Sequence, residues 1–218
     1  HPCFRIKVKY ERRQQPKMKG VNITINLLGL MFFGNACFSN PINDVPFKAP
    51  DGLYNFYIEI PGGTKEKWEV DKKTGVLKKD QQNGKDRVVN FLPYPGNYGF
   101  VPQTLAGDGD PIDLIDLDES LGRGTIKRIS VIGAMYFEDN NEIDYKFVGV
   151  SREGTFKHLD SIEDLFFEKP SVLEIIKLWF LSYKKQGKMV FFKFLDSREA
   201  SRLIEAANQR WKANRQND

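Results

Sequence analysis

Apolar and polar positions alternate in short runs from residue 53 onward, a pattern that is typical of β-strands. Turn-forming residues separate the runs, and Pro61-Gly62-Gly63 stops the first of them. Asn140-Asn141 joins two of the longest runs as a hairpin. The pattern predicts strands over 53–60, 66–71, 75–80, 123–139, 142–151 and 188–195.

Two later segments show helical spacing instead. The first begins at Pro170, which suits a first helical turn, and Gly187 ends it. The second covers 198–211 behind a cap at Asp196 or Ser197. Many short strands followed by helices predict an α+β fold that is mainly β. We expect a small closed five-stranded OB-like β-barrel with two helices packed outside, preceded by an N-terminal extension.

The extension is predicted to cover residues 1–44, and one domain to cover 45–218. Residues 21–38 carry no charge, but their hydrophobic run over 27–33 is too short to span a bilayer. Residues 18–37 are typical of a secretory signal, which would place 1–17 upstream of the true start. A loose match to a bacterial lipobox also makes Cys37 a candidate for a lipid anchor.

The alternative for this stretch is a buried strand or helix of the domain. A signal at 18–37 would make the protein exported, periplasmic or membrane-anchored, and its absence would favour the cytoplasm. A linker with three prolines leads from this stretch into the domain.

Composition narrows the chemistry that the chain can support. The 218 residues are 40% hydrophobic, which suits one globular domain with a core, and a net charge of +4 is too small to indicate nucleic-acid binding. Two cysteines (Cys3, Cys37) and two histidines (His1, His158) exclude a disulfide framework, a cysteine-based zinc site and a histidine cluster. Any metal would therefore be a hard ion held by carboxylates, such as Mg²⁺, Mn²⁺ or Ca²⁺.

Six carboxylates crowd into residues 108–119, namely Asp108, Asp110, Asp113, Asp116, Asp118 and Glu119. Apolar residues interleave with them, so the segment is anchored to a core. Two like charges about 4 Å apart repel by roughly 4 kcal/mol at an effective dielectric near 20, so these acids need protons, basic partners or metal ions. An EF-hand is excluded, because Ile112 and Asp113 occupy loop positions that require an oxygen ligand and a glycine. A solvated acidic turn is the alternative.

Two further groups carry candidate chemistry. "EDNNEIDYK" contains Asp139, Asp144 and Lys146, for which a polar hairpin tip is the alternative. "LPYPGNYGFVPQT" places Tyr94 and Tyr98 in a loop rich in proline and glycine, which we predict to contain no regular element. These tyrosines and the nearby Arg87 are suitable donors to phosphate oxygens, although the tyrosines could simply pack.

These stretches, in this order, resemble the soluble family I inorganic pyrophosphatases. "DGDPIDLI" fits the family's Asp-x-Asp-Pro-x-Asp signature, and four other stretches resemble its remaining motifs: "IEIPGGTKEKWEVD", "YPGNYGF", "EDNNEIDYK" and "SYKK". The resemblance covers about residues 45 to 212. It implies hydrolysis of pyrophosphate to two orthophosphates with several Mg²⁺ ions per site, for which Mn²⁺ or other divalent ions could substitute. It also implies a homo-oligomer, a hexamer as in bacterial forms.

The resemblance further implies roles for individual residues. The metal ligands would be Asp108, Asp113, Asp139, Asp144 and Glu59. Asp110 would orient or deprotonate the attacking water, with Tyr98, Lys67 and Arg87 as further catalytic residues. The phosphates would be held by Lys67, Arg87, Tyr98, Lys146, Tyr183 and Lys184, and Tyr94 and Glu69 would line the site. Two departures are the spacing between Arg87 and "YPGNYG", which differs by one residue from bacterial forms, and Trp68, where tyrosine is common.

Two other functions compete with this one. A small barrel with aromatic residues and lysines can bind single-stranded nucleic acid, but an acidic loop would repel its phosphates in the absence of metal. A calcium-binding structural domain of an exported protein could use the same acids. Release of phosphate from pyrophosphate with Mg²⁺, and its inhibition by Ca²⁺, would separate the three functions in one assay.

Overall fold

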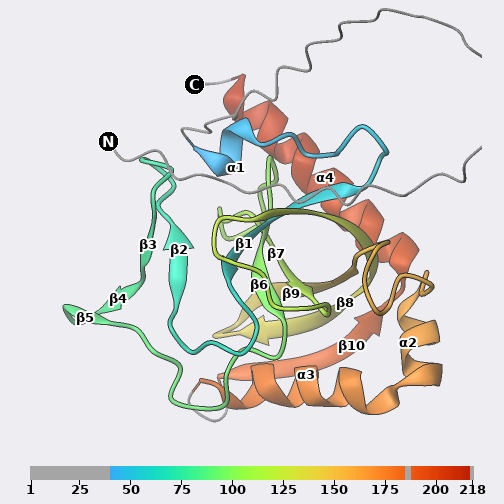
Figure 1. Ribbon diagram of the computed structural model, residues 1–218. Coiled ribbons are helices and arrows are strands. Elements are labelled where there is room, and N and C mark those ends of the chain that lie inside the picture. The colour runs from blue at the N-terminus through green and yellow to red at the C-terminus, as the bar shows by residue number, and fades with distance from the viewer. Residues whose placement is uncertain (1–39, 185–187, 217–218) are drawn as a thin grey trace, which may run out of the picture. The chain divides into compact units, whose positions relative to one another are not determined.

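Five strands close into a ring at the centre of the fold (Figure 1). The computed structural model describes residues 40–184 and 188–216. In order of pairing, the ring strands are β1 (Tyr54–Ile60), β6 (Asn97–Val101), β7 (Ile112–Asp116), β9 (Glu142–Val150) and β8 (Ile126–Asp139). Because β8 also pairs with β1, the ring has no open side between these strands. All the ring pairs are antiparallel except β7 with β9.

One further strand and the helices lie outside the ring. β10 (Met189–Leu195) pairs with the second half of β8. The described residues form four helices: α1 (Pro41–Asp44), α2 (Ile162–Glu168), α3 (Pro170–Ser182) and α4 (Ser197–Arg215). α3 lies along β10 and α4 packs against β8 (Figure 1). Asp196 caps α4 as predicted, since its side chain accepts a hydrogen bond from the Glu199 N–H at 2.7 Å.

A pair of short hairpins stands beside the ring (Figure 1). One joins β2 (Trp68–Val70) to β3 (Leu77–Lys79), and the other joins β4 (Gln81–Gln82) to β5 (Lys85–Asp86). We call residues 66–88, which contain both hairpins, the flap. Neither hairpin is paired with a strand of the ring.

Strand alternation divides the core into two main clusters. On β7, Leu114 packs with Phe56, Phe147 and the α4 residue Ile204, whereas its neighbour Ile115 belongs to the cluster under α2 and α3. Successive side chains of a strand point to opposite faces, so one strand serves both clusters.

The two strands β1 and β6 approach closely at a glycine. A Cβ added at Gly99 would lie 2.0 Å from the Tyr57 carbonyl oxygen. No side chain larger than hydrogen fits there without moving the backbone of β1 or β6. Gly99 therefore permits the pairing that places its neighbour Tyr98 beside β1.

The prediction of a mainly β fold with helices outside is confirmed. The six predicted strands are present as β1, β2, β3, β8, β9 and β10, with ends that differ from the expected ones by three residues or fewer. The prediction that 92–104 contains no regular element is wrong, because Asn97–Val101 forms β6. The expectation of two helices was also incomplete, because it lacked α1 and α2.

The predicted extension falls mostly outside the described residues, and so does the proposed signal at 18–37 with Cys37. Within the described part, Ile42 packs against Tyr57, Val70 and Phe100, so the chain joins the folded unit slightly before residue 45. No helix in that part is both long and apolar enough to cross a membrane.

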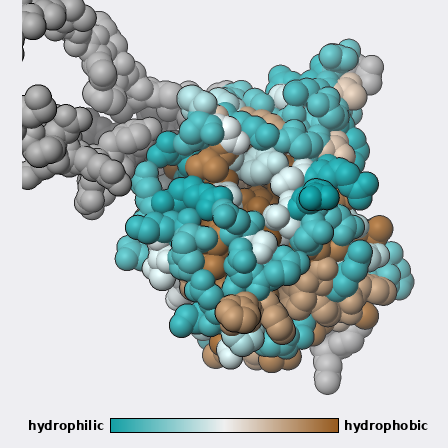
Figure 2. Space-filling view, turned by 90° about the vertical axis from the view of Figure 1, so that its right-hand side faces the viewer, coloured by the Kyte–Doolittle hydropathy of each residue, from teal (hydrophilic) through white to brown (hydrophobic). Residues whose placement is uncertain are grey.

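One face of the folded unit exposes apolar side chains among hydrophilic ones (Figure 2). Phe166 and Phe167 on α2 are 54% and 89% exposed. Ile175 and Leu178 on α3, and Val190 and Phe192 on β10, are also exposed. Contiguous patches of exposed apolar side chains often mark surfaces for association, whereas single exposed ones do not.

Candidate active site

A pocket of about 200 Å³ collects polar side chains from five separate parts of the chain. Its walls come from β1, the flap, the segment before and within β7, the β8–β9 hairpin and the end of α3, and it also contacts Tyr94 and Tyr98. The lining residues are Glu59, Ile60, Lys67, Trp68, Glu69, Tyr94, Tyr98, Asp108, Asp113, Asp139, Glu142, Ile143, Asp144, Lys146, Phe180, Tyr183 and Lys184. The five predicted metal ligands are all among them.

Lys146 lies between two of the aspartates. Its Nζ is 2.5 Å from Asp113 Oδ2 and 2.7 Å from Asp144 Oδ1. Asp144 and Lys146 share one face of β9 because they are two residues apart on a strand. Burial by itself would lower the pKa of the Lys146 ammonium group. The negative charges of Asp113 and Asp144 have the larger combined effect and raise this pKa. Burial also raises the pKa of Asp144, and Lys146 counteracts this.

Glu59 is the most deeply placed acid of the pocket. It is 8% exposed, and its Oε1 accepts a hydrogen bond from the Val70 N–H at 2.7 Å. Burial raises the pKa of Glu59 to about 8, because removal from water disfavours the charged form. The hydrogen bond from Val70 acts in the opposite direction. A cation bound beside Glu59 would favour the carboxylate.

The predicted phosphate donors approach from the other walls. Lys67 extends from the flap and contacts Glu69, and its Nζ lies 3.4 Å from Asp80 Oδ2. Lys184 pairs with Asp139. Tyr98 is partly buried, and removal of its hydroxyl from water raises the pKa of that group well above the ordinary value. The hydroxyl therefore remains protonated and can donate to an anion.

An aromatic stack supports two tyrosines of the pocket. Trp179 of α3 contacts Tyr94 at a tilt and stacks on Tyr183, with ring centroids 4.5 and 4.6 Å away. Its indole N–H donates to the Leu92 carbonyl oxygen at 3.0 Å, which ties the helix to the segment before β6. Burial raises the pKa of Tyr94 well above its ordinary value. Tyr94 thus remains a neutral hydroxyl in the wall.

Two predicted residues, Arg87 and Asp110, do not line the pocket. Arg87 pairs with Asp80, and its Nη1 is 3.0 Å from Asp80 Oδ2, the atom that also faces Lys67. Asp110 is about half exposed and pairs with Lys72, whose Nζ also donates to the Gly109 carbonyl oxygen at 3.1 Å.

Other residues line or support the pocket although the sequence did not single them out. Glu142 falls within "EDNNEIDYK", between two aspartates that were assigned, so its position was a usable signal. Trp68, which stands where tyrosine is common, lies in the wall although no role was predicted for it. Asp80 joins Lys67 to Arg87. It is the last residue of a predicted strand, and no motif in the sequence marks it as a site residue.

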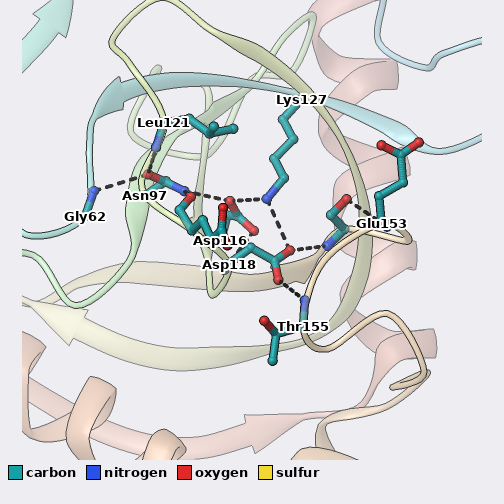
Figure 3. A network of polar contacts seen from close by, with 10 residues as sticks. Gly62, Asn97, Asp116, Asp118, Leu121, Lys127, Glu153 and Thr155 are labelled. Carbon is teal, nitrogen blue, oxygen red and sulfur yellow. Dashed lines mark hydrogen bonds and ion pairs between the residues drawn. The ribbon is translucent and has the colours of Figure 1, made fainter. Parts of the chain in front are cut away.

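Two further acids of the 108–119 segment, Asp116 and Asp118, belong to a separate network (Figure 3). Lys127 Nζ lies 2.7 Å from Asp116 Oδ2 and 3.1 Å from Asp118 Oδ2. Asp118 also accepts hydrogen bonds from the Ser151 and Thr155 N–H groups at 2.8 and 3.0 Å. This part of the acidic segment is therefore balanced by a lysine and backbone donors.

The pocket itself retains an excess of negative groups. Seven carboxylates line it against three ammonium groups. As the side chains stand, no group of three or more Asp, Glu, His or Cys residues in the described ranges is placed to hold a metal ion. The available donors are nevertheless all oxygens, the ligands that hard ions such as Mg²⁺ prefer. The donor chemistry thus fits a divalent ion of this class.

Comparison with known proteins points to one family. The family model for inorganic pyrophosphatase matches residues 56–212. A chloroplastic soluble inorganic pyrophosphatase of Arabidopsis thaliana is 32% identical over 197 residues, which cover 79% of this chain. The chain spans 65% of the length of that relative.

Solved structures agree with the sequence matches. The Trypanosoma cruzi vacuolar soluble pyrophosphatase, truncated at its N-terminal domain and in complex with PPi, has a TM-score of 0.76 at 27% identity, covering 81% of this chain and 80% of that one. Inorganic pyrophosphatase from Thermus thermophilus has a TM-score of 0.69 at 32% identity, covering 79% and 99%. The family match includes every predicted site residue, and the chain belongs to the inorganic pyrophosphatase family.

Proposed function

We propose that the protein hydrolyses inorganic pyrophosphate to two orthophosphates in a reaction that depends on Mg²⁺. One observation carries the proposal: lysines and an excess of carboxylates converge in a single small pocket. A volume of about 200 Å³ suits a small ligand, since typical sites for drug-sized molecules measure roughly 300–1,000 Å³. Carboxylates would repel a bare phosphate anion, so the substrate needs accompanying cations.

Five residues would hold the metal, namely Asp108, Asp113, Asp139, Asp144 and Glu59. Mg²⁺, when bound, neutralises phosphoryl oxygens and lowers the pKa of water. Mn²⁺ and other divalent ions with a preference for oxygen ligands are possible substitutes.

The protein's own residues bind and orient the substrate. Lys67, Lys146 and Lys184 supply positive charge from three walls of the pocket, and Tyr98 and Tyr183 supply hydroxyl donors. Water attacks one phosphorus atom, and the bond from that phosphorus to the bridging oxygen breaks. The electron pair of that bond leaves with the second phosphate. Positioning and charge stabilisation account for most of the rate in such reactions.

Asp110 is the proposed acceptor of the proton from the attacking water. Its carboxylate pairs with Lys72, so catalysis requires it to exchange this partner for the water. An exposed ion pair contributes only about 0–1 kcal/mol to stability, so the free energy needed to break this pair is small. Arg87 is the further proposed phosphate donor, and it pairs with Asp80, the carboxylate that also faces Lys67.

The proposal also covers the type of barrel, the assembly of the protein and its export. The closed ring of five strands supports an OB-like barrel. The exposed Ile175 and Leu178 on α3 support a homo-oligomer. The proposed signal at 18–37 favours export, with Cys37 as the lipid anchor.

Release of phosphate from pyrophosphate tests the function directly. We expect turnover with Mg²⁺, loss of turnover with EDTA, restoration by added Mg²⁺ and inhibition by Ca²⁺. A nucleoside triphosphate and a phosphate monoester serve as comparison substrates and should be cleaved much more slowly. If pyrophosphate is not hydrolysed under any of these conditions, the proposed function is wrong.

A further inference from the structure

The flap brings Lys67 and Glu69 to the pocket, yet it is not part of the ring. Within the described residues, β2 pairs with β3 and with no ring strand, so sheet hydrogen bonds do not set its distance from the pocket. Apolar contacts of Val70 with Tyr57 and Phe100 hold its far end. The Val89 and Tyr94 N–H groups donate to the Lys65 and Thr64 carbonyl oxygens at 2.8 and 3.0 Å and hold the base of the flap. The end that contains Lys67 has a side-chain attachment in addition.

Arg123 provides such an attachment from the connection between β7 and β8. Its Nη2 lies 3.1 Å from Glu66 Oε2, and its guanidinium carbon lies 4.7 Å from the centre of the Trp68 ring. The Trp68 indole N–H donates to the same Glu66 oxygen at 3.2 Å. Arg123 therefore contacts the residues on both sides of Lys67 in the sequence.

The base of this attachment is held rigidly to the ring. The Gly124 N–H donates to the Ile58 carbonyl oxygen at 2.8 Å, and the Ile58 N–H donates to the Thr125 carbonyl oxygen at 2.9 Å. Both bonds lie next to Arg123 in sequence, and Ile58 precedes Glu59. The arginine thus connects the flap to the β1 backbone beside the deepest acid of the pocket.

The chemistry of the contact favours arginine. Its planar guanidinium can stack on an indole ring and donate to a carboxylate at the same time, which an ammonium group does less well. Arg123 Nε is buried and has no hydrogen-bond partner within the described ranges, so stacking and the bond to Glu66 carry the contact. Lys79 adds a second cation to Glu66, with Nζ 3.0 Å from Oε1.

We propose that Arg123 is a positioning residue that, through Glu66 and Trp68, holds Lys67 and Glu69 of the flap at the pocket. This inference rests on the proposed function for its effect on substrate, because Lys67 is taken to bind a phosphate. An error of about 1 Å in a binding group can cost a large part of the rate or affinity. Lys67 is taken to hold a phosphate in the bound substrate and in the transition state alike, so removal of the contact should raise KM with little change in kcat.

The test compares Arg123→Met with Arg128→Met. Arg128 is a matched control, because it also forms ion pairs, to Asp51 and Glu153, but lies away from the flap on β8. We expect Arg123→Met to raise the KM for pyrophosphate at least fivefold with kcat within twofold, and Arg128→Met to leave both unchanged. Arg123→Lys should restore part of the loss, since it retains the charge but not the stacking.

Hydrogen exchange supplies a readout that does not depend on hydrolysis. In Arg123→Met, amides of 66–79 should exchange severalfold faster while those of 126–150 remain unchanged. The proposal is overturned if the variant matches Arg128→Met in both KM and exchange, or if exchange accelerates equally in both segments. Should the wild type fail to hydrolyse pyrophosphate, the proposed function falls, and the exchange experiment still decides whether Arg123 holds the flap.

Discussion

Glu59 illustrates how the environment of one side chain can determine its charge. Burial raises its pKa from 4.5 to about 8, so without a cation the folded protein favours the protonated acid near neutral pH. The predicted role as a metal ligand needs the carboxylate. Metal binding and loss of the Glu59 proton should therefore be coupled.

This coupling gives a prediction for stability in EDTA. A raised folded-state pKa contributes stability below about pH 4.5, and this contribution is lost as the pH rises to about 8. Glu59→Gln retains the hydrogen bond from Val70 but does not titrate. The unfolding free energy of the wild type relative to Glu59→Gln should fall by a few kcal/mol between pH 5 and 8.5, as measured by urea unfolding. A difference that is constant with pH would contradict the account.

Asp110 gives a second prediction, for activity. Asp110→Asn removes the proposed proton acceptor and should lower kcat by about 100-fold or more. The side chain is half exposed, so circular dichroism and the melting temperature should not change. Asp51→Asn is the control, because it makes the same chemical change in an exposed ion pair far from the pocket. Turnover of Asp110→Asn at the wild-type rate would remove Asp110 from the mechanism.

Among the secondary-structure elements, β7 shows how one strand divides its acids between two tasks. Asp113 lines the pocket, whereas Asp116, at the end of the strand and 0% exposed, bonds to Lys127 and Asn97. Asn97 also accepts hydrogen bonds from the Gly62 and Leu121 N–H groups at 3.2 and 3.0 Å (Figure 3). The network ties the ends of β1, β6 and β7 together beside Tyr98.

Removal of the network's lysine should be costly. Lys127→Met leaves Asp116 and Asp118 without their cation, and an unpaired buried charge costs roughly 3–5 kcal/mol. We expect a loss of this size in the free energy of unfolding, measured with urea. Lys48→Met, which breaks an exposed pair with Glu205, should cost less than about 1 kcal/mol. Equal losses in the two variants would show that the Lys127 network does not stabilise the fold.

Strands in which apolar and polar residues alternate clearly were predictable from the sequence. Strands that form only through pairing with a distant strand were not. The hairpin of β8 and β9 has strong alternation and an Asn-Asn turn, so sequence predicted it almost to its ends. β6 was missed because its glycine and neighbouring prolines indicate a loop. Gly99 is required there by the approach of β1, which only the pairing reveals.

Across the fold, α1 links several distant parts. The Asn43 backbone carbonyl accepts a hydrogen bond from the Gln103 side chain, and the Asn43 side chain accepts one from Trp211 of α4. Val45, which follows α1, is 1% exposed. Asn40 also donates to the Lys72 carbonyl oxygen of the flap at 3.0 Å. The segment 40–45 thus packs against the body of the fold.

Truncation tests this conclusion. A chain that begins at Asn40 retains every contact described above, so it should hydrolyse pyrophosphate and unfold at a higher temperature than a chain that begins at Leu53. A chain that begins at Leu53 loses the buried Ile42 and Val45, which should cost at least about 2–5 kcal/mol. Thermal unfolding measures both. Equal stability of the two shortened chains would place the domain boundary later than the packing indicates.

The candidate site was predictable as far as its residues carry a local motif. "DGDPIDLI" and "EDNNEIDYK" identified the aspartates that line the pocket, because their spacing follows the family's pattern. Asp80 and Arg123 lack such a motif. Asp80 joins Lys67 to Arg87 and Arg123 reaches Glu66, contacts that arise when separated segments meet.

The sequence by itself determined the fold class, most strand positions and the oxygen-based chemistry of the pocket, because periodicity and residue type are local properties. Tertiary structure decided which acids face the pocket and which face Lys127, where Asp110 and Arg87 lie, and how the flap is held. These features depend on distances between residues far apart in the chain. Ring closure and the contacts between segments outside the ring set those distances, and no local pattern encodes them.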